Sequence, residues 1–298
     1  DTLQALRAAP KQSKQAPSSI IDVRIILDEM RLIKSTAEID LMRRAAAIST
    51  QAHIRAMQFA KTAKNEYHLE AELHHEFAMQ GAKHPAYGTI VGAGENACIL
   101  HYTENNQQLK ANDLVLIDAG CEWQGYASDI TRTFPVSGTF SGEQKALYQL
   151  VLNAQLAAFE IIKPGNTIAQ ASDKAIAVIT QGLLDLGILK GELADNIAKL
   201  TYREFYMHGL SHWLGLDVHD VGNYKIDGED RPLIPGMVLT VEPGIYIAPD
   251  AKVDQKWRGI GIRIEDNLLI TNNGHENLTI AAPKSIDEIE ALMMNKSL

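Results

Sequence analysis

Five side chains of types that bind metal ions occur along this chain of 298 residues: Asp118, Asp129, His212, Glu242 and Glu265. Four are carboxylates, and three of these lie at or near the ends of apolar runs typical of buried strands. A buried carboxylate is unfavourable unless it is paired or binds a cation. We therefore expect the five residues to converge on a pair of divalent metal ions that would activate a water molecule.

The first two carboxylates occupy the two arms of a predicted antiparallel strand pair, Leu114–Asp118 and Asp129–Phe134. Neighbouring strands lie about 5 Å apart, so both carboxylates could reach one metal ion. The alternative is structural, with Asp118 capping a turn and Asp129 placed as a charge at a strand end.

The later carboxylates also have structural alternatives. Arg263 and Glu265 are two residues apart in the strand-like run Gly259–Ile270, so they would share a face and could simply form a salt bridge. Glu242 stands in the sequence Thr-Val-Glu-Pro-Gly and could be an ordinary residue at the end of a strand, before a turn.

Histidines are concentrated in the segment His208–Asp220, which contains His208, His212 and His219. The spacing of the first two matches a zinc-binding helix motif, but residue 209 is Gly where that motif needs Glu. The alternative is a polar surface loop with incidental histidines.

His101, which follows Ile-Leu, is by itself more typical of a core histidine. A ligand set rich in oxygen with one imidazole is typical of a site for Mn²⁺, Co²⁺ or Zn²⁺, and not of a structural zinc site built from cysteines.

The elements that would position these residues are predicted from turns, caps and apolar runs. The predicted helices are Ser35–Lys61, which opens with a capping box, Glu66–Gln80, which Gly81 ends, and two helices in Glu143–Leu189 broken at Lys163-Pro164-Gly165. The predicted strands, besides those named above, are Ile20–Leu27, Met237–Glu242 and a strand with a tight turn in Gly88–His101.

The order of elements repeats along the chain. Helices are followed by a strand, an acid, a glycine turn and another strand that carries an acid, and this succession occurs twice. The repeat predicts an α+β fold of two similar halves, with the site at their junction.

Composition favours an ordinary globular protein, with 46% hydrophobic and 22% charged residues. The net charge is −9 and no long basic run occurs, so we expect no nucleic-acid partner. No apolar run approaches the roughly 18 residues of a membrane span. Cys98 and Cys121 are too few for a disulfide framework, which favours the cytoplasm. Residues 8–19 are rich in Ala, Pro, Ser, Gln and Lys, like a linker.

Long motifs give the pattern a specific resemblance. The sequences LVLIDAG (114–120), SDITRTF (128–134), MHGLSHWLGLDVHD (207–220), LTVEPGIY (239–246) and GIRIED (261–266) resemble those of the pita-bread metallopeptidases. Among these, the chain most resembles the bacterial aminopeptidase P family, from about residue 29 to about residue 292. The resemblance implies a pita-bread fold of two pseudo-symmetric halves, with helices packed on antiparallel strands.

The resemblance also implies roles for the site residues. It implies a dinuclear site, usually Mn²⁺, in which Asp129 and His212 bind one ion and Asp118 binds the other. Glu265 would bridge both ions, and Glu242 would bind them and act on the bridging water. The remaining matched residues are the outer-sphere histidines His101, His208 and His219, and the site arginine Arg263.

The family's enzymes release the N-terminal residue from peptides with proline in the second position. The resemblance further implies that residues 20–298 form the catalytic domain and residues 1–19 the end of a preceding domain that supports oligomerisation. Three alternatives remain: a prolidase restricted to dipeptides, a non-catalytic binding protein on the same fold, and a creatinase-like hydrolase of a non-peptide C–N bond. Non-catalytic relatives typically lose metal ligands, and this chain keeps all five.

Overall fold

The computed structural model describes Gln4 and residues 21–294. The predictions of a linker at residues 8–19 and of the end of a preceding domain lie outside the described residues. Among the helices that are described, none combines the length and apolar character needed to cross a membrane.

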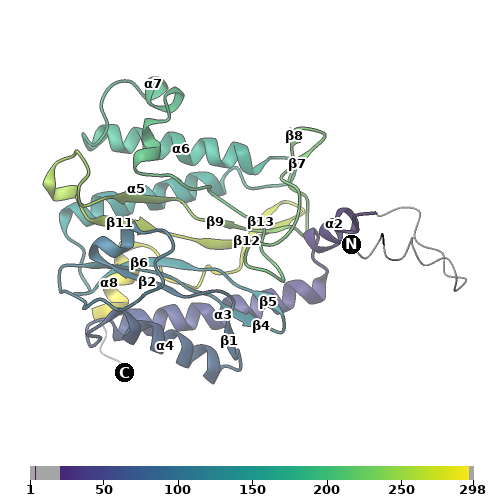
Figure 1. Ribbon diagram of the computed structural model, residues 1–298, viewed down its shortest axis with the longest axis horizontal. Helices are drawn as coiled ribbons and strands as arrows, with labels where there is room; N and C mark the ends of the chain where they lie inside the picture. Colours follow the sequence, from purple (N-terminus) through teal and green to yellow (C-terminus); the bar gives the residue numbers. More distant parts are fainter. Residues whose placement is uncertain (1–3, 5–20, 295–298) are drawn as a thin grey trace, which may run out of the picture.

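Two pairs of long helices enclose the strands (Figure 1). Helix α3 (Thr36–Phe59) packs against α4 (Glu66–Met79), and α5 (Gly142–Phe159) packs against α6 (Ile168–Asp185). The shorter helices are α2 (Arg24–Leu32), α7 (Leu193–Ala198) and α8 (Ile286–Met294). Because α8 contacts both α3 and α5, it joins the two helical pairs.

Local sequence signals explain where the long helices begin and end. Capping boxes start three of them, at Ser35 for α3, Ser141 for α5 and Thr167 for α6. Gly81 and Gly165 have φ values of +94° and +88°, a conformation that glycine adopts without strain. Gly81 lies just beyond the end of α4, and Gly165 lies in the turn between α5 and α6. The four predicted helices and the break between the last two are confirmed.

The first half of the molecule supplies an antiparallel sheet in the order β2-β3-β6, formed by Ile90–Ala93, Leu114–Asp118 and Thr131–Pro135. In its register, Asp118 stands opposite Ile90 on one side and Thr131 on the other. The predicted pairing of the two acid-bearing segments is confirmed, although Asp129 itself lies two residues before β6. The three short strands β1 (His84–Pro85), β4 (Cys121–Trp123) and β5 (Tyr126–Ala127) form a separate small sheet.

The second half supplies a sheet in the order β13-β12-β9, formed by Gly274–Asn277, Asp266–Thr271 and Val238–Val241, and the pair β10 (Gly244–Ile247) and β11 (Ile260–Arg263). The hairpin of β7 (Lys225–Ile226) and β8 (Glu229–Asp230) is exposed. Strand β11 lies against β3 and β6, so the strands of the two halves meet. The predicted α+β arrangement, in which helices precede acid-bearing strands twice, is confirmed.

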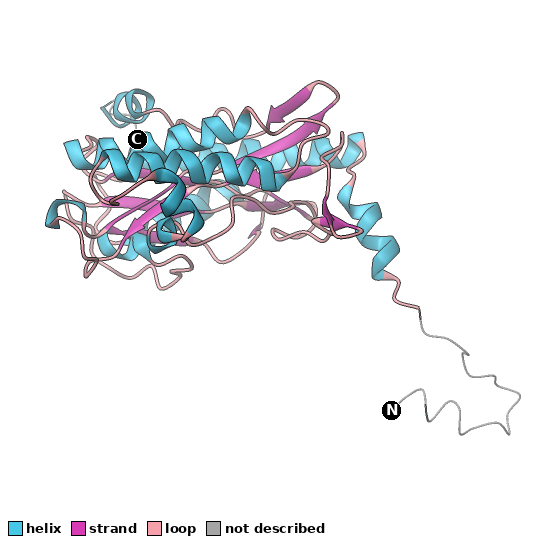
Figure 2. Cartoon of the chain, turned by 90° about the horizontal axis from the view of Figure 1, so that it is seen from above, coloured by secondary structure: helices cyan, strands magenta, loops and turns pink. Residues whose placement is uncertain are grey.

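Two predictions about strands are wrong. The run Ile20–Leu27 is not a strand where it is described: α2 covers Arg24–Leu32 and extends from one end of the body (Figure 2). The Asp22 carboxylate accepts the N–H of Arg24 at 3.0 Å and so favours a helix start, whereas a strand there would need a neighbouring strand edge.

The run Gly259–Ile270 is two strands rather than one. Between β11 and β12, the N–H of Ile264 donates to the Pro243 carbonyl and the N–H of Glu265 donates to the Thr131 carbonyl. The backbone here leaves one pairing partner and meets another, so the continuous apolar pattern hides a change of sheet.

Candidate metal centre

A pocket of about 480 Å³ lies where the strands of the two halves meet. All nine side chains singled out from the sequence line it: His101, Asp118, Asp129, His208, His212, His219, Glu242, Arg263 and Glu265. Strand ends explain the convergence. Asp118 ends β3, Glu242 directly follows β9, and Glu265 fills the step between β11 and β12.

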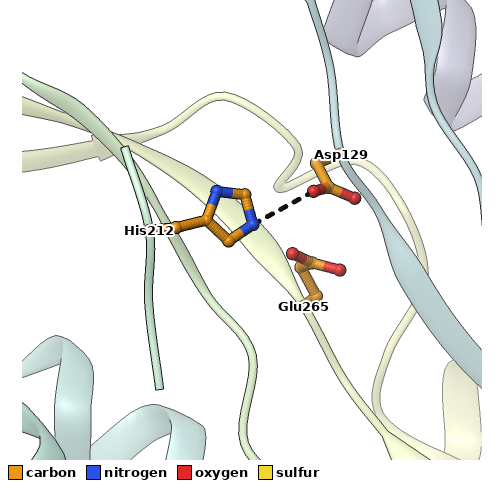
Figure 3. Close-up of side chains that lie close together, drawn as sticks. All are labelled: Asp129, His212 and Glu265. Atoms are coloured by element: carbon orange, nitrogen blue, oxygen red, sulfur yellow. Dashed lines mark ion pairs between the residues drawn. The ribbon is translucent and has the colours of Figure 1, made fainter. Parts of the chain in front are cut away.

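Three of the predicted ligands form the tightest group. One ligand atom from each of Asp129, His212 and Glu265 lies within 4.8 Å of the others, and the three side chains point toward one another (Figure 3). Nε2 of His212 is 3.4 Å from Oδ2 of Asp129 and 3.3 Å from Oε1 of Glu242. The other ring nitrogen, Nδ1, donates to the Trp213 carbonyl at 3.0 Å, which fixes the ring with Nε2 toward the carboxylates.

Asp118 and Asp129 are linked through one phenol. The hydroxyl of Tyr87 contacts Oδ1 of Asp118 at 2.6 Å and Oδ1 of Asp129 at 2.5 Å. Burial, with the charges of both carboxylates, raises the pKa of Tyr87 well above its usual value, so the phenol keeps its proton. Arg263 donates from Nη2 to Oδ2 of Asp118 at 2.6 Å. The alternative of a simple Arg263–Glu265 salt bridge is therefore wrong, because the arginine pairs with Asp118.

Glu265 is buried and only partly satisfied. Its Oε2 accepts a hydrogen bond from the Thr131 hydroxyl at 2.6 Å, whereas its Oε1 has no hydrogen-bond partner among the described residues. Burial and the charges of Asp129 and Glu242 raise the pKa of Glu265 well above its usual value. A carboxylate oxygen in this position is one that a cation would stabilise.

The charges of the pocket are unbalanced without a cation. Burial, opposed by the charges of His212 and Arg263, raises the pKa of Glu242 to about 8. Burial lowers the pKa of His212, but the hydrogen bond and charge of Asp129 outweigh it and raise that pKa to about 9. Burial raises the pKa of Asp129, but hydrogen bonding to His212 leaves it lowered. Without a cation, the carboxylates of the cluster outnumber its positive charges, so Glu242 and His212 keep their protons at neutral pH.

The other histidines differ from one another. Nε2 of His208 contacts the Tyr246 hydroxyl at 2.8 Å, and that hydroxyl accepts from Nη1 of Arg263 at 2.8 Å. Burial and the charge of Arg263 lower the pKa of His208 to about 4, so its ring is neutral. The ring of His219 meets that of His212 edge to face, at 4.4 Å between centroids. His101 is exposed at the pocket, so the alternative of a core histidine is wrong.

Residues 40–272 match the sequence profile of metallopeptidase family M24. The chain belongs to this family. It is 54% identical over 294 residues to the Xaa-Pro aminopeptidase of Escherichia coli, which covers 98% of the chain and 66% of that protein. It is 57% identical over 276 residues to the Xaa-Pro aminopeptidase of Haemophilus influenzae, covering 93% of the chain and 64% of that protein. The chain thus spans slightly less than two thirds of the length of these relatives.

A solved structure of zinc-substituted E. coli aminopeptidase P in complex with product superposes with a TM-score of 0.95 at 54% identity, over 98% of the chain and 66% of that protein. The predicted pita-bread fold is thereby confirmed. Membership of an M24 metallopeptidase family also implies divalent metal ions, although it does not identify them.

The residues present fit such ions. The pocket offers four carboxylates and one oriented imidazole, a set of hard oxygen ligands with one borderline nitrogen that suits Mn²⁺, Co²⁺ or Zn²⁺. The unpartnered Oε1 of Glu265 is a second, independent sign, because a buried carboxylate oxygen without a donor normally faces a cation or water.

Sequence reasoning missed three hydroxyl residues of this M24 site: Tyr87, Thr131 and Tyr246. Each contacts at least one site residue through its hydroxyl. Thr131 and Tyr246 lie within the quoted motifs, so the motifs themselves could have indicated them. Tyr87 lies outside every motif, and no signal in its surroundings distinguishes it from a packing tyrosine.

Proposed function

We propose that this chain hydrolyses the first peptide bond of peptides with proline in the second position and releases the N-terminal residue. The observation that carries the proposal is the convergence of five ligand-type side chains in one pocket, with an oxygen of Glu265 left unpartnered among the described residues. The names of the relatives from E. coli and H. influenzae support the choice of substrate. We further propose that residues 20–298 form the catalytic domain and act in the cytoplasm.

Asp129 and His212 would hold one metal ion, Asp118 the other, and Glu242 and Glu265 both. We propose Mn²⁺ as the native metal, because four of the five ligands are carboxylates. Two such ions, when bound, would lower the pKa of a water molecule and polarise the peptide carbonyl.

The protein's own groups would handle the protons and the substrate. Glu242 lies at the pocket surface with its carboxylate 3.3 Å from His212, where it can accept a proton from the attacking water and return it to the leaving nitrogen. His219 is exposed to the pocket and can donate to the substrate carbonyl as it gains negative charge. Neutral His208 is fixed at both ring nitrogens, by the Gly209 carbonyl and the Tyr246 hydroxyl, so its ring can form a wall against which the substrate backbone lies.

The preference for proline would arise from the pocket's apolar wall. Ile90, Leu100 and Val218 line the pocket beside the carboxylates. A pyrrolidine ring could pack on this wall, and the proline nitrogen carries no N–H that the site would have to satisfy.

The test is release of the N-terminal residue from an Xaa-Pro-Yaa tripeptide after chelation and again after addition of Mn²⁺. We expect activity to be lost and then restored, with Xaa-Ala-Yaa tripeptides and Xaa-Pro dipeptides cleaved poorly. Preference for dipeptides would instead indicate a prolidase. No peptide cleavage at stoichiometric metal would contradict the proposal and favour a non-peptide C–N substrate or a binding role.

A matched pair of variants tests the role of Glu242. We expect Glu242→Gln to abolish turnover, because glutamine cannot accept the proton of the water. Glu276→Gln is the control, because Glu276 lies on β13 and its carboxylate pairs with Arg43 away from the pocket. Wild-type rates for Glu242→Gln would refute the assignment.

A further inference from the structure

A separate pocket, of about 190 Å³, shares no lining residue with the metal centre. Trp213 lines this second pocket, while its neighbour His212 lines the first. The other walls are the start of α6 at Thr167–Ala169, Tyr224, whose ring stacks on Trp213 at 5.3 Å, and the pair Asp230 and Arg231. Nothing in the proposed hydrolysis uses this pocket.

Three N–H groups of the lining residues are buried and lack acceptors among the described residues. Arg231 is only 8% exposed, and its Nη2 donates to both oxygens of Glu29 at 2.7 Å. Its Nε and Nη1 have no partner, and neither does Nε1 of Trp213, a residue that is 1% exposed. Buried donors are nearly always satisfied in folded proteins, so these three indicate an absent acceptor.

The start of α6 adds a fourth source of positive potential. The first N–H groups of a helix have no partner within it, and the helix dipole makes this end attractive to anions. In α6, which has 18 residues, the Thr167 side chain caps only the N–H of Gln170. The N–H groups of Ile168 and Ala169 therefore remain on the wall of the same pocket.

We infer that this pocket binds a small oxyanion, a carboxylate or a tetrahedral anion of the sulfate and phosphate class. Because Glu29 holds Nη2 of Arg231, the anion would accept a single N–H of this guanidinium, from Nε or Nη1, and the indole N–H of Trp213 and the start of α6 would complete the contacts. Its volume suits a single group of this size rather than a nucleotide or a peptide.

One charge in the pocket opposes the anion. Asp230 is a lining residue, and its carboxylate is only partly neutralised by Lys225, whose Nζ lies 3.6 Å from Oδ1. This opposition supplies a test in its own right, because removal of the Asp230 charge should strengthen binding. A pocket that merely holds a water would show no such dependence.

The experiment follows the indole N–H resonances of ¹⁵N-labelled, zinc-loaded protein during titration with sulfate and, separately, with acetate. Sodium chloride holds the ionic strength constant. The chain has three tryptophans, and the resonance of Trp213 is identified with Trp213→Phe. We expect a saturable shift of the Trp213 resonance alone. Saturation by sulfate would assign a tetrahedral anion and saturation by acetate a carboxylate, whereas saturation by neither would overturn the inference.

Three variants locate the anion. Arg231→Met should weaken binding at least about tenfold, and Glu29→Gln, which keeps the arginine donors and removes the negative charge paired with them, should retain or strengthen binding. Asp230→Asn should strengthen binding several-fold, and because Asp230 is exposed this variant decides the matter even if Arg231→Met fails to fold. A sulfate response that survives in folded Arg231→Met, or an unchanged or weaker affinity in Asp230→Asn, would overturn the inference.

Discussion

Glu242 should destabilise the metal-free protein at alkaline pH, and Glu242→Gln should remove this effect. Burial, opposed by the charges of His212 and Arg263, raises the pKa of Glu242 from its ordinary 4.5 to about 8. The folded metal-free protein therefore holds this proton more tightly than the unfolded chain does. The resulting stability is fully present below pH 4.5 and is lost as the pH rises through 8.

The size of the effect follows from the two pKa values. Between about pH 5.5 and about pH 9 the unfolded chain is already ionised at this position, whereas the folded protein loses the proton near pH 8. At about 1.36 kcal/mol per pH unit, the free energy of unfolding falls by about 3 kcal/mol over this range on account of Glu242. In Glu242→Gln the side chain has nearly the same shape as glutamate but does not titrate. The free energy of unfolding of this variant should therefore not fall with pH on account of this position.

The assay is urea unfolding in the presence of a chelator at about pH 5.5 and about pH 9, for the wild type, Glu242→Gln and Glu276→Gln. We expect the stability of Glu242→Gln relative to the wild type to rise by about 3 kcal/mol between the two pH values. Glu276→Gln should show no such change, because hydrogen bonding to Arg43 lowers the pKa of Glu276 and keeps its titration below this range. A pH-independent difference for Glu242→Gln would refute the reasoning.

Three further predictions concern single residues. His219→Ala should retain its metal content by elemental analysis and lose kcat/KM about a hundredfold; loss of metal would show that His219 is a ligand. Tyr246→Phe removes the hydroxyl bound to His208 and should lower kcat about tenfold or more in the tripeptide assay; an unchanged kcat would exclude a positioning role for this hydroxyl. A Cβ at Gly120 would lie 1.7 Å from the Ser128 carbonyl oxygen, so Gly120→Ala should lower the free energy of unfolding by at least about 3 kcal/mol. Gly142→Ala should change it by less than about 0.5 kcal/mol, because its Cβ would meet no other part of the described chain within 4 Å apart from its own helix, and equal effects of the two substitutions would contradict the packing argument.

Much of the fold follows from signals that act over a few residues. A capping box such as that at Ser35 connects residues three apart, so the sequence specifies the helix start without knowledge of the rest of the molecule. The run Ile20–Leu27 shows the limit of such signals. Its sequence is typical of a strand, but from Arg24 it is part of α2 and pairs with no strand among the described residues, and only Leu32 of α2 is buried. Whether an apolar run pairs as a strand is decided by its neighbours in space.

The site was predictable to the extent that its residues are chemically distinctive. Carboxylates at the ends of apolar runs are conspicuous, because burial makes them unfavourable unless something compensates. Tyr87, by contrast, binds Asp118 and Asp129 from 31 and 42 residues away, and tyrosine is common in cores. Nor could the sequence show that Arg263 turns to Asp118, 145 residues earlier, rather than to nearby Glu265.

The two halves are joined at the positions of the ligands themselves. The N–H of Glu265 donates to the Thr131 carbonyl at 3.1 Å, and the N–H of Asp129 donates to the side chain of Asn267 at 3.0 Å. Arg132 donates to the Glu265 carbonyl at 2.6 Å and forms a fully buried ion pair with Asp266 at 2.7 Å.

These contacts do not involve the carboxylate oxygens of the ligands, so they can hold the backbone in place while those oxygens remain available. The carboxylates contributed by the two halves repel one another, and the backbone bonds beside them oppose that repulsion. The arrangement favours a site whose geometry exists before metal binds. Metal binding would then be favourable because it relieves the repulsion between carboxylates that the fold holds close together.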